Sequence, residues 1–301
     1  MKRIILIISL LSVFMFSCGS SNSNEGNNNN NGVSVGLSVS TLNNPFFVSL
    51  SEGAKAKAKE LNINLNVVNA SDDTAKQASD IEDLISKNVK VIIVNPVDSD
   101  AVAPAVESAI AANIPVIALD RIVNGVEVDA QIASDNVAGA KMAGEYLVEL
   151  IGEKAKVAEL IGIPGASATI DRGKGFHEVA DNKLNVIASQ TANFNRAEGL
   201  TVMENILQAN PDVKGVFAHN DEMALGALEA VKAIGKDIVI IGFDATDDAV
   251  LSVKEGDMKA TVAQKPDLMG AIAVETALKI INGETVEKNI PVEVTLIKEW
   301  L

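Results

Sequence analysis

Short runs of apolar, often β-branched residues alternate with amphipathic segments along most of the chain, and this alternation restricts the fold more than any other feature. Strands are expected at 33–39, 65–69, 89–94, 116–119, 157–161, 186–189, 216–218, 238–242 and 260–263. Between the first two, the segment 45–61 carries Phe47, Leu50 and Ala54 at helical spacing. Continuously apolar strands are typical of a parallel sheet covered by helices on both faces. The sequence therefore predicts an α/β protein with doubly wound sheets.

The strand–helix pattern starts again near the middle of the chain. One series runs from residue 33 to about 135, and a second runs from about 156 to about 264. Because one sheet holding every strand would be unusually wide, we predict two similar Rossmann-like lobes. After the second series, the segment 266–281 is a further amphipathic helix, and a closing strand is expected at about 292–297.

The N-terminal segment has the features of an export signal. Two basic residues precede an apolar run at 4–16, which has the length of a signal peptide and is short for a membrane span. The only cysteine, Cys18, follows this run, and the polar stretch after it is rich in Asn and Ser. Since a Cys in this place resembles a bacterial lipobox, we predict a signal peptide at 1–17, a diacylated Cys18 and a tether at 18–32. The lipid is then the only membrane contact. A plain signal peptide with an incidental Cys, or a transmembrane anchor, is the alternative.

Charge and residue types exclude several classes of function. The formal net charge is −15, whereas nucleic acids and anionic lipids select for clustered Lys and Arg, so we expect no nucleic-acid partner. The folded part has two histidines, His177 and His219, and no cysteine, which gives a metal site little support. A Walker A loop, a GxGxxG after the first strand and a nucleophile elbow are all missing from the sequence. We therefore predict a protein that is not an enzyme and that uses no cofactor or metal.

Polar and aromatic side chains gather where the predicted strands end, which is where ligands bind in doubly wound sheets. Four of the six phenylalanines outside the signal peptide lie at these ends. Aromatic rings pack against the C–H faces of a sugar, while carboxylate, amide and guanidinium groups satisfy hydroxyls that both donate and accept. The pattern therefore predicts a sugar ligand. Taken singly, each residue also has a structural explanation, such as Asn44 as the N-cap before Pro45, or Phe47 as a core residue of its helix.

A family resemblance rests on six stretches of the sequence. They are 40–50 (STLNNPFFVSL), 95–102 (NPVDSDAV), 113–121 (NIPVIALDR), 132–137 (IASDNV), 220–228 (NDEMALGAL) and 242–244 (GFD). The chain resembles the type I periplasmic sugar-binding proteins of ABC importers, and among them the bacterial D-ribose-binding proteins, from about residue 33 to about 297. The resemblance implies two Rossmann-like lobes joined by a hinge of three crossings, with the sugar between them. The lobes it implies are 33–134 plus 266–293, and 135–265 plus 294–301.

The resemblance also implies a set of ligand-binding residues, carried over position by position. In the first lobe these are Asn44, Phe46, Phe47, Asn95, Asp120 and Arg121; in the second they are Arg172, Phe194, Asn220, Phe243 and Asp244, with Gln264 near a crossing. It further implies no catalytic residue, D-ribose as the ligand, and delivery to an ABC permease by a monomeric periplasmic lipoprotein. A chemoreceptor is a further candidate partner. One position departs from the family pattern, because His219 stands where we expect Gln.

Other functions on the same fold stay open at this stage. Allose, galactose, xylose or a furanosyl autoinducer could replace ribose, and the chain could serve as a sensing receptor. The only tryptophan, Trp300, is the penultimate residue, which argues against the stacking typical of glucose/galactose sites. A transcription regulator of the lactose-repressor type would need a basic helix-turn-helix before the first lobe, where this chain has an apolar run and an Asn tract.

Overall fold

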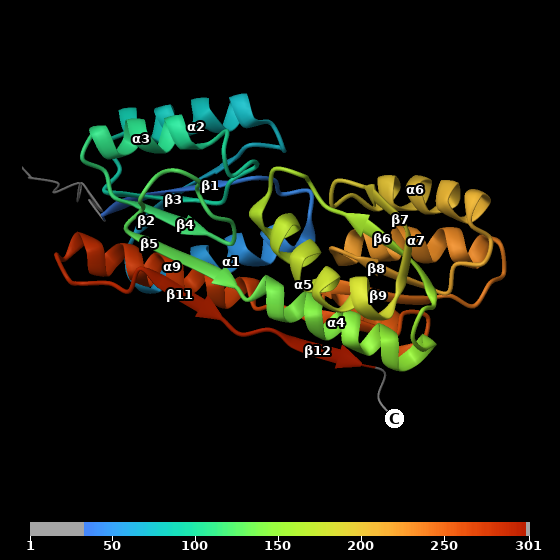
Figure 1. The fold of residues 1–301 in the computed structure, drawn as a ribbon. Helices are drawn as coiled ribbons and strands as arrows, with labels where there is room; N and C mark the ends of the chain where they lie inside the picture. The colour runs from blue at the N-terminus through green and yellow to red at the C-terminus, as the bar shows by residue number, and fades with distance from the viewer. Residues whose placement is uncertain (1–32, 299–301) are drawn as a thin grey trace, which may run out of the picture. The chain divides into compact units, whose positions relative to one another are not determined.

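The computed structural model describes residues 33–298, which form two six-stranded sheets flanked by helices (Figure 1). The first sheet has the order β11 (Asn289–Val292), β5 (Ala130–Ser134), β4 (Val116–Leu119), β3 (Val91–Val94), β1 (Ser34–Val39) and β2 (Asn64–Asn69). The second has the order β12 (Thr295–Lys298), β10 (Ala260–Ala263), β9 (Val239–Asp244), β8 (Gly215–Ala218), β6 (Lys156–Ile161) and β7 (Asn185–Thr191). The predictions about the signal peptide, Cys18 and the tether, and the position of Trp300, lie outside the described residues.

Each sheet and its helices make one lobe. Lobe 1 contains the first sheet with α1 (Pro45–Glu60), α2 (Thr74–Ser86), α3 (Ala103–Ala111) and α9 (Pro266–Ile281). Lobe 2 contains the second sheet with α4 (Asn136–Ile151), α5 (Ser167–Lys183), α6 (Arg196–Ala209), α7 (Asp221–Ala233) and α8 (Asp247–Lys254). Within each lobe the first five strands follow the same spatial order, so the restart of the pattern is a structural repeat. The predicted fold class, two doubly wound α/β lobes, is confirmed.

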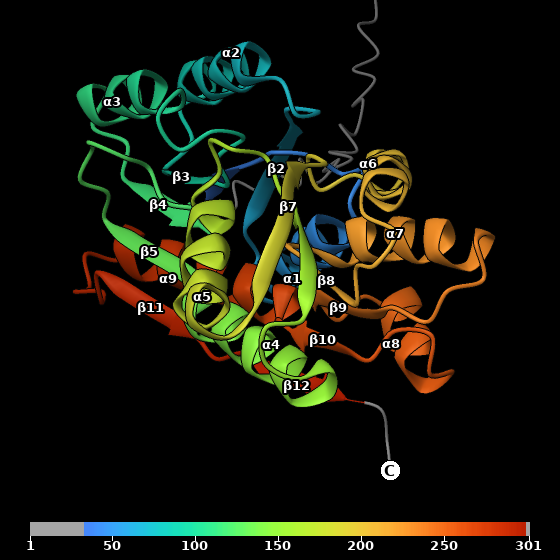
Figure 2. The same cartoon turned by 45° about the vertical axis from the view of Figure 1, so that its right-hand side comes forward.

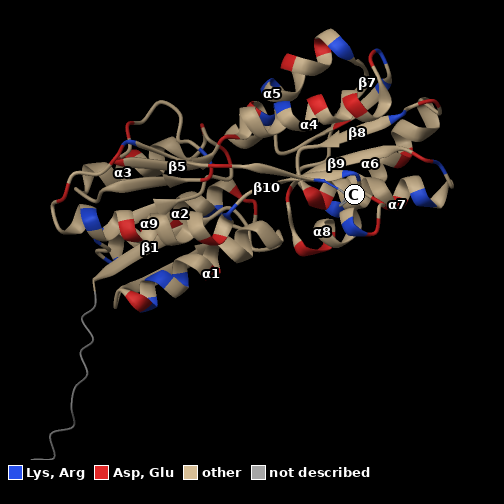
Figure 3. Cartoon of the chain, turned by 90° about the horizontal axis from the view of Figure 1, so that it is seen from below, with Lys and Arg blue, Asp and Glu red and all other residues tan. Residues whose placement is uncertain are grey.

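The sheets are buried on both faces, as their apolar sequences require. Every residue of β3, β4 and β8 is buried. On one face of the first sheet Ile93 packs with residues of α1 and α9, and on the other Ile92 packs with residues of α2 and α3. Figure 2 shows these two helix pairs on opposite sides of the sheet. Lys, Arg, Asp and Glu lie mainly on the helices and loops around the strands (Figure 3).

Close helix packing in lobe 1 depends on glycine. A Cβ atom on Gly53 would lie 2.1 Å from the backbone oxygen of Asp267, and one on Gly270 would lie 2.1 Å from that of Leu50. These glycines let α1 and α9 approach until their backbones are in contact. Because α9 follows the whole of the second strand series, this packing ties the C-terminal part of the chain to its first helix.

Two strand predictions need correction. The single closing strand at about 292–297 is wrong, because β11 pairs with β5 in lobe 1 while β12 pairs with β10 in lobe 2. The chain passes between lobes at this point, so its pairing partner changes and the ladder is interrupted. Strand β5 was not predicted, because its buried residues alternate with partly exposed ones instead of forming a continuous apolar run. The chain crosses between the sheets after β5, after β10 and after β11.

Candidate ligand-binding site

A pocket that is partly open to solvent lies between the lobes at the carboxyl ends of the strands. It is lined by Asn44, Phe46, Phe47, Asp120, Arg121, Ala168, Arg172, Phe194, Asn220, Asp244 and Gln264. Ten of the twelve residues expected in the site line this pocket. They come from both lobes, as the resemblance implied, although they lie as much as 220 positions apart in the sequence (264 − 44).

The topology explains why these residues meet. In each sheet the strand order reverses beside the first strand of the lobe, at β1 in lobe 1 and at β6 in lobe 2. The connections that leave neighbouring strands there run to opposite faces of the sheet and leave a crevice between them. Asn44 follows β1 and caps α1, accepting from the Phe46 N–H at 2.9 Å, with Pro45 as the first helical residue. This cap holds Phe46 and Phe47 in the first turn, edge to face with ring centroids 5.1 Å apart.

Three of the pocket residues have positive φ angles: Asp120 at 66°, Phe194 at 59° and Asp244 at 125°. Such angles are uncommon outside glycine and are a strain for a bulky residue such as phenylalanine. Each of these residues lies at or just beyond the end of a strand, where the turn directs its side chain into the space between the lobes. Concentrated backbone strain of this kind is typical of ligand sites.

In lobe 1 an adjacent acid and base form the polar wall. The Asp120 and Arg121 side chains are both 3% exposed, and Arg121 Nε lies 3.8 Å from Asp120 Oδ2. Arg121 Nη1 donates to the carbonyl oxygen of Pro96 at 2.7 Å, which fixes the guanidinium. Burial raises the pKa of Asp120 and lowers that of Arg121, while the opposite charge of each partner counteracts the shift. Two charged groups that can form strong hydrogen bonds are therefore held where little water reaches them.

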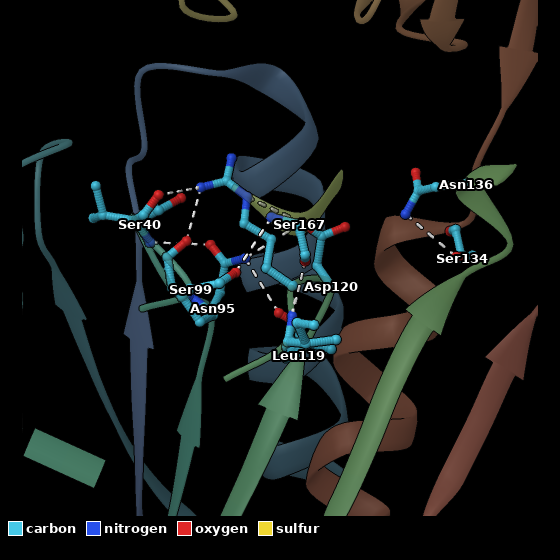
Figure 4. Close-up of polar contacts among 12 residues, drawn as sticks. Ser40, Asn95, Ser99, Leu119, Asp120, Ser134, Asn136 and Ser167 are labelled. Carbon is cyan, nitrogen blue, oxygen red and sulfur yellow. Dashed lines mark hydrogen bonds and ion pairs between the residues drawn. The ribbon is translucent and has the colours of Figure 1, made fainter. Parts of the chain in front are cut away.

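Asn95 supports this pair from behind and does not line the pocket. Its Oδ1 accepts from the Ser40 N–H at 3.0 Å, and its Nδ2 donates to the Leu119 carbonyl at 3.2 Å and to Asp120 Oδ2 at 3.3 Å (Figure 4). The side chain is fully buried. The hydrogen bond from Nδ2 orients the Asp120 carboxylate, and the direct ligand contact expected of Asn95 stays a prediction.

In lobe 2 Arg172 is the central cation. Its Nε donates to Asn136 Oδ1 at 2.8 Å and its Nη1 donates to the carbonyl oxygen of His219 at 2.5 Å. The same Nη1 lies 3.7 Å from Asp244 Oδ1, and the guanidinium carbon lies 3.8 Å from the centre of the Phe243 ring. Burial lowers the pKa of Arg172, but an arginine still stays protonated at physiological pH.

Phe243 is the second expected residue that does not line the pocket. It is fully buried in the core of lobe 2, beneath Arg172. A Cβ atom on Gly139 of α4 would lie 2.8 Å from this ring, so the glycine makes room for it. The ring supports the arginine from the side away from the ligand space.

Phe194 brings an aromatic ring from lobe 2 to Arg121 of lobe 1. The Arg121 guanidinium carbon lies 5.5 Å from the Phe194 ring centre and 5.2 Å from that of Phe47. The Phe194 ring lies against Gly162, where a Cβ atom would come within 2.1 Å of it. A larger residue at position 162 would therefore displace the ring.

A carboxylate and two amides complete the polar lining. Gln264 Nε2 donates to Asp244 Oδ1 at 2.7 Å, and Asn220 Nδ2 donates to the Phe194 carbonyl at 3.3 Å. Burial raises the pKa of Asp244 well above its ordinary value, and the nearby carboxylate of Asp221 adds to this, although Arg172 counteracts it. Burial also raises the pKa of Asp221 to about 7.

Some polar atoms at this site are buried without a partner. Among the described residues, Asp120 Oδ1, Arg121 Nε and Gln264 Oε1 have no hydrogen-bond partner. A buried polar group that stays unpaired costs about 1–3 kcal/mol, and more if it is charged. One donor and two acceptors converging on a pocket with aromatic walls fit a ligand that carries several hydroxyl groups.

Direct contacts between the lobes border the pocket. The Ser99 N–H donates to the Gly165 carbonyl at 2.9 Å, and the Ser167 N–H donates to Ser99 Oγ at 3.2 Å. Ser167 Oγ in turn accepts from the Ile122 N–H at 3.0 Å. These residues, like Ala168 and Asn136, were not predicted. Asn136 lies within the motif at 132–137, but no signal in the sequence indicated that it would hold Arg172.

No group of three or more His, Cys, Asp or Glu side chains within 33–298 is arranged to hold a metal ion. Over the same residues, none of the helices is both long and apolar enough to span a membrane.

Comparison with known proteins identifies the family. The model of the periplasmic binding protein domain matches residues 35–285. The chain belongs to this family. It is 52% identical over 251 residues to the ribose import binding protein RbsB of Bacillus subtilis (strain 168), a match that covers 83% of this chain and 82% of that protein. It is 51% identical over 260 residues to RbsB of Escherichia coli (strain K12), with 86% and 88% covered.

Solved structures agree with this assignment. An ABC transporter periplasmic solute-binding protein from Actinobacillus succinogenes with bound D-allose superposes with a TM-score of 0.83 and 35% identity, over 88% of this chain and 97% of that one. Relatives and structural neighbours are solute-binding proteins, so this chain is a binding protein and not an enzyme, as the sequence predicted. Membership of the family also makes it an exported protein.

Proposed function

We propose that this chain binds D-ribose between its two lobes and delivers it to the permease of an ABC importer. The observation that carries the proposal is the pocket itself, where rings from both lobes flank Arg121 and buried polar atoms of Asp120 and Gln264 stay unpaired. A pentose offers C–H faces to the rings and hydroxyl groups to these atoms. The names of the two ribose import relatives support the choice of sugar.

The ligand-binding residues proposed are the twelve expected from the sequence, in two layers. The ten that line the pocket would contact the sugar, whereas Asn95 and Phe243 would hold Asp120 and Arg172 in place. The two arginines and two aspartates make charge-assisted hydrogen bonds, which are about twice as strong as neutral ones. The proposed lobes are 33–134 plus 266–293, and 135–265 plus 294–301.

Sugar binding should favour the closed arrangement of the lobes. The pocket residues divide between lobes, so a ligand that contacts both has higher affinity for the closed form, and this difference is what shifts the equilibrium. The contacts of Ser99 with Gly165 and Ser167 can form only when the lobes approach. The permease would then recognise the closed, sugar-bound form. Small-angle scattering with and without ribose tests closure, and unchanged curves at saturation would reject it.

The cellular setting is also part of the proposal. Cys18 would carry the lipid that anchors a monomeric protein to the membrane, with 18–32 as the tether. The ABC permease is the proposed partner, and a chemoreceptor is a second candidate.

The experiment that tests the proposal is calorimetric titration of the mature protein with a panel of sugars. D-ribose should bind with a free energy of about −8 to −10 kcal/mol, which corresponds to a sub-micromolar to low-micromolar dissociation constant. Allose, galactose, xylose and a furanosyl ligand complete the panel. If one of these sugars bound tightly and ribose did not bind, that sugar and not ribose would be the ligand.

A further inference from the structure

A chain of ionisable side chains lies directly behind Arg172, outside the pocket. Glu159 on β6 is 1% exposed and is shared by two histidines. His219 Nε2 lies 2.9 Å from Glu159 Oε1, and His177 Nε2 lies 3.2 Å from Glu159 Oε2. Ser189 of β7 also donates to Glu159 Oε2. His177 continues to the surface, where its Nδ1 lies 2.6 Å from Asp181 Oδ1.

This row of hydrogen-bonded side chains connects to the ligand site through His219. The carbonyl oxygen of His219 accepts the hydrogen bond from Arg172 Nη1 at 2.5 Å, and the next residue, Asn220, lines the pocket. The His219 ring is buried, tilted against Phe217 with centroids 5.4 Å apart, and held by Glu159. The position of the His219 backbone, and with it that of Arg172, therefore depends on how the imidazole is held.

The hydrogen bonds define the protonation states. Both ring nitrogens of His177 face carboxylates, so both carry protons and the ring is a cation. His219 needs a proton on Nε2 to donate to Glu159, and its buried Nδ1 has no partner among the described residues. A neutral His219 can leave Nδ1 as an unpaired acceptor, whereas a cationic one would bury an unpaired N–H beside Arg172, at greater cost.

We propose that the chain His219–Glu159–His177 positions Arg172, and that protonation of His219 weakens ligand binding. The inference rests on the proposed sugar-binding function, which it extends to a dependence on pH. It concerns His219, which stands where the resemblance to the ribose-binding proteins led us to expect Gln.

The surroundings of the two histidines shift their pKa values in opposite directions. Burial lowers the pKa of His219, and the positive charges of Arg172 and His177 lower it further, while Glu159 counteracts them. Burial alone would lower the pKa of His177, but Asp181 and Glu159 outweigh this and raise it. Burial would raise the pKa of Glu159, but His219, Ser189 and His177 together lower it. His177 is therefore protonated more readily than an ordinary histidine and His219 less readily, while Glu159 ionises more readily than an ordinary glutamate.

The lowered pKa of His219 determines how ligand affinity should change with pH. As the pH falls below about 6.5, unfolded chains take up a proton at His219 before the folded protein does, so acid opposes the native arrangement around Arg172. When His219 is finally protonated in the folded state, its charge and its unpaired N–H disturb the carbonyl that holds Arg172. Affinity for the ligand should therefore fall on acidification, by roughly five-fold or more, in the usual range for coupled sites.

Two histidines in the described part of the chain make a direct measurement possible. NMR of ring-labelled protein should give one histidine pKa below and one above the ordinary value of about 6.5. The signal that is missing in His177→Gln belongs to His177. Removing the cationic His177 should raise the pKa of His219, because a positive neighbour is lost. Adding D-ribose should lower the pKa of His219, since coupling between proton and ligand is reciprocal. A His219 pKa that moves with neither change would overturn the proposal.

Calorimetry of three proteins completes the test. For the wild type, the ratio of the D-ribose dissociation constant below the His219 pKa measured by NMR to that at about pH 7.5 should be roughly five or more. The ratio should be smaller for His219→Gln, whose amide can still donate to Glu159 but cannot be protonated. The pH dependence that remains in this variant comes from buried carboxylates such as Asp244, whose pKa burial raises. In His177→Gln the loss of affinity should begin at higher pH. Equal ratios in the wild type and His219→Gln would overturn the proposal.

Failure of the proposed function has a different signature. If the wild type binds D-ribose at no pH, the function is wrong. The His219 pKa of ligand-free His177→Gln then tests whether His177 and His219 are coupled through Glu159. A pKa higher than in the wild type supports the coupling, and an unchanged pKa overturns it.

Discussion

Replacing Asp120 by asparagine separates ligand binding from folding, because the substitution should lower affinity strongly and change folding stability little. Asp120 is 4% exposed, its Oδ2 accepts only one long hydrogen bond from Asn95, and its Oδ1 has no partner among the described residues. Asparagine has the same shape and tolerates the positive φ of 66° at this position. The Asp120→Asn variant therefore changes charge and hydrogen-bonding capacity with little change in geometry.

The expected loss of affinity can be worked from the contacts. A ligand hydroxyl that donates to the Asp120 carboxylate makes a charge-assisted hydrogen bond, which contributes about 1.5–3 kcal/mol. An amide nitrogen at the Oδ1 position accepts nothing, and Arg121 loses its counter-charge. We therefore expect the dissociation constant for D-ribose to rise about ten- to one-hundred-fold in calorimetric titrations at neutral pH.

Folding stability should change much less than affinity, because two effects oppose each other. The folded-state pKa of Asp120 is raised above its ordinary value of 3.8, chiefly by burial. A carboxyl group with a raised folded pKa favours the native state at low pH, and this contribution is lost as the pH rises through the folded pKa. At neutral pH, Asp120→Asn removes a carboxylate that is costly to bury, but it also removes the counter-charge of the buried Arg121. Without sugar, the variant should therefore unfold close to the wild type in denaturant titrations.

Asp212→Asn is the matched control, because Asp212 is an exposed aspartate that pairs with Lys156 away from the pocket. It should leave both affinity and stability unchanged. If Asp120→Asn bound ribose as tightly as the control does, or unfolded far more easily, the assignment of this carboxylate to ligand binding would be refuted.

Three further substitutions test the aromatic wall, the interlobe contact and the anchor. Gly162→Ala places a methyl group within 2.1 Å of the Phe194 ring, so calorimetry should show at least a roughly ten-fold loss of affinity with the fold intact by circular dichroism; unchanged affinity would contradict the role of this ring. Ser167→Ala removes the acceptor of the Ile122 N–H and should weaken ribose binding by about 1 kcal/mol while scattering shows incomplete closure; a wild-type scattering curve and affinity would count against it. Cys18→Ser should abolish lipid attachment, and mass spectrometry of the native protein showing a free N-terminus elsewhere would disprove the anchor.

The fold was largely predictable because its signals are local. Continuous apolar runs identified β3, β4 and β8, and they bury every residue of these strands as expected. The strand that escaped prediction, β5, mixes buried and partly exposed positions within AQIAS. The closing strand was misjudged because a change of pairing partner, from β5 to β10, leaves no mark in the sequence.

The sequence was enough to predict that residues of the candidate site would lie together, but not which of them would line the pocket. Topology places the strand ends together, and that is enough to expect Asn44, Asp120 and Asp244 in one crevice. Whether a side chain faces the ligand or stands behind another residue depends on turns and rotamers. Asn95 donates to Asp120 and the Phe243 ring lies against Arg172, and neither contact could be predicted from the sequence.

The interlobe contacts and the buried histidine chain escaped prediction for a related reason. Ser167 and Glu159 lie outside the six stretches that carry the resemblance, whereas Ser99 lies inside 95–102. All three are common residue types, and their roles arise from backbone atoms and from partners far along the chain. His219 departs from the family pattern in the sequence itself, but its contacts with Glu159 and Arg172 could not be predicted from it.

The features that make this site suited to a ligand also make it costly for the fold. Positive φ angles at Asp120, Phe194 and Asp244 and unpaired buried atoms of Arg121 and Gln264 lie within one pocket. Backbone strain costs about 1–3 kcal/mol for each residue, and an unpaired buried group costs a similar amount. The ligand-free protein is therefore less stable than its two well-packed lobes would allow, and a sugar that pairs these atoms recovers part of that free energy. At a ligand concentration of one hundred dissociation constants, binding stabilises the native state by about 2.7 kcal/mol. If the proposed function holds, sugar binding, lobe closure and folding stability all depend on the same set of contacts.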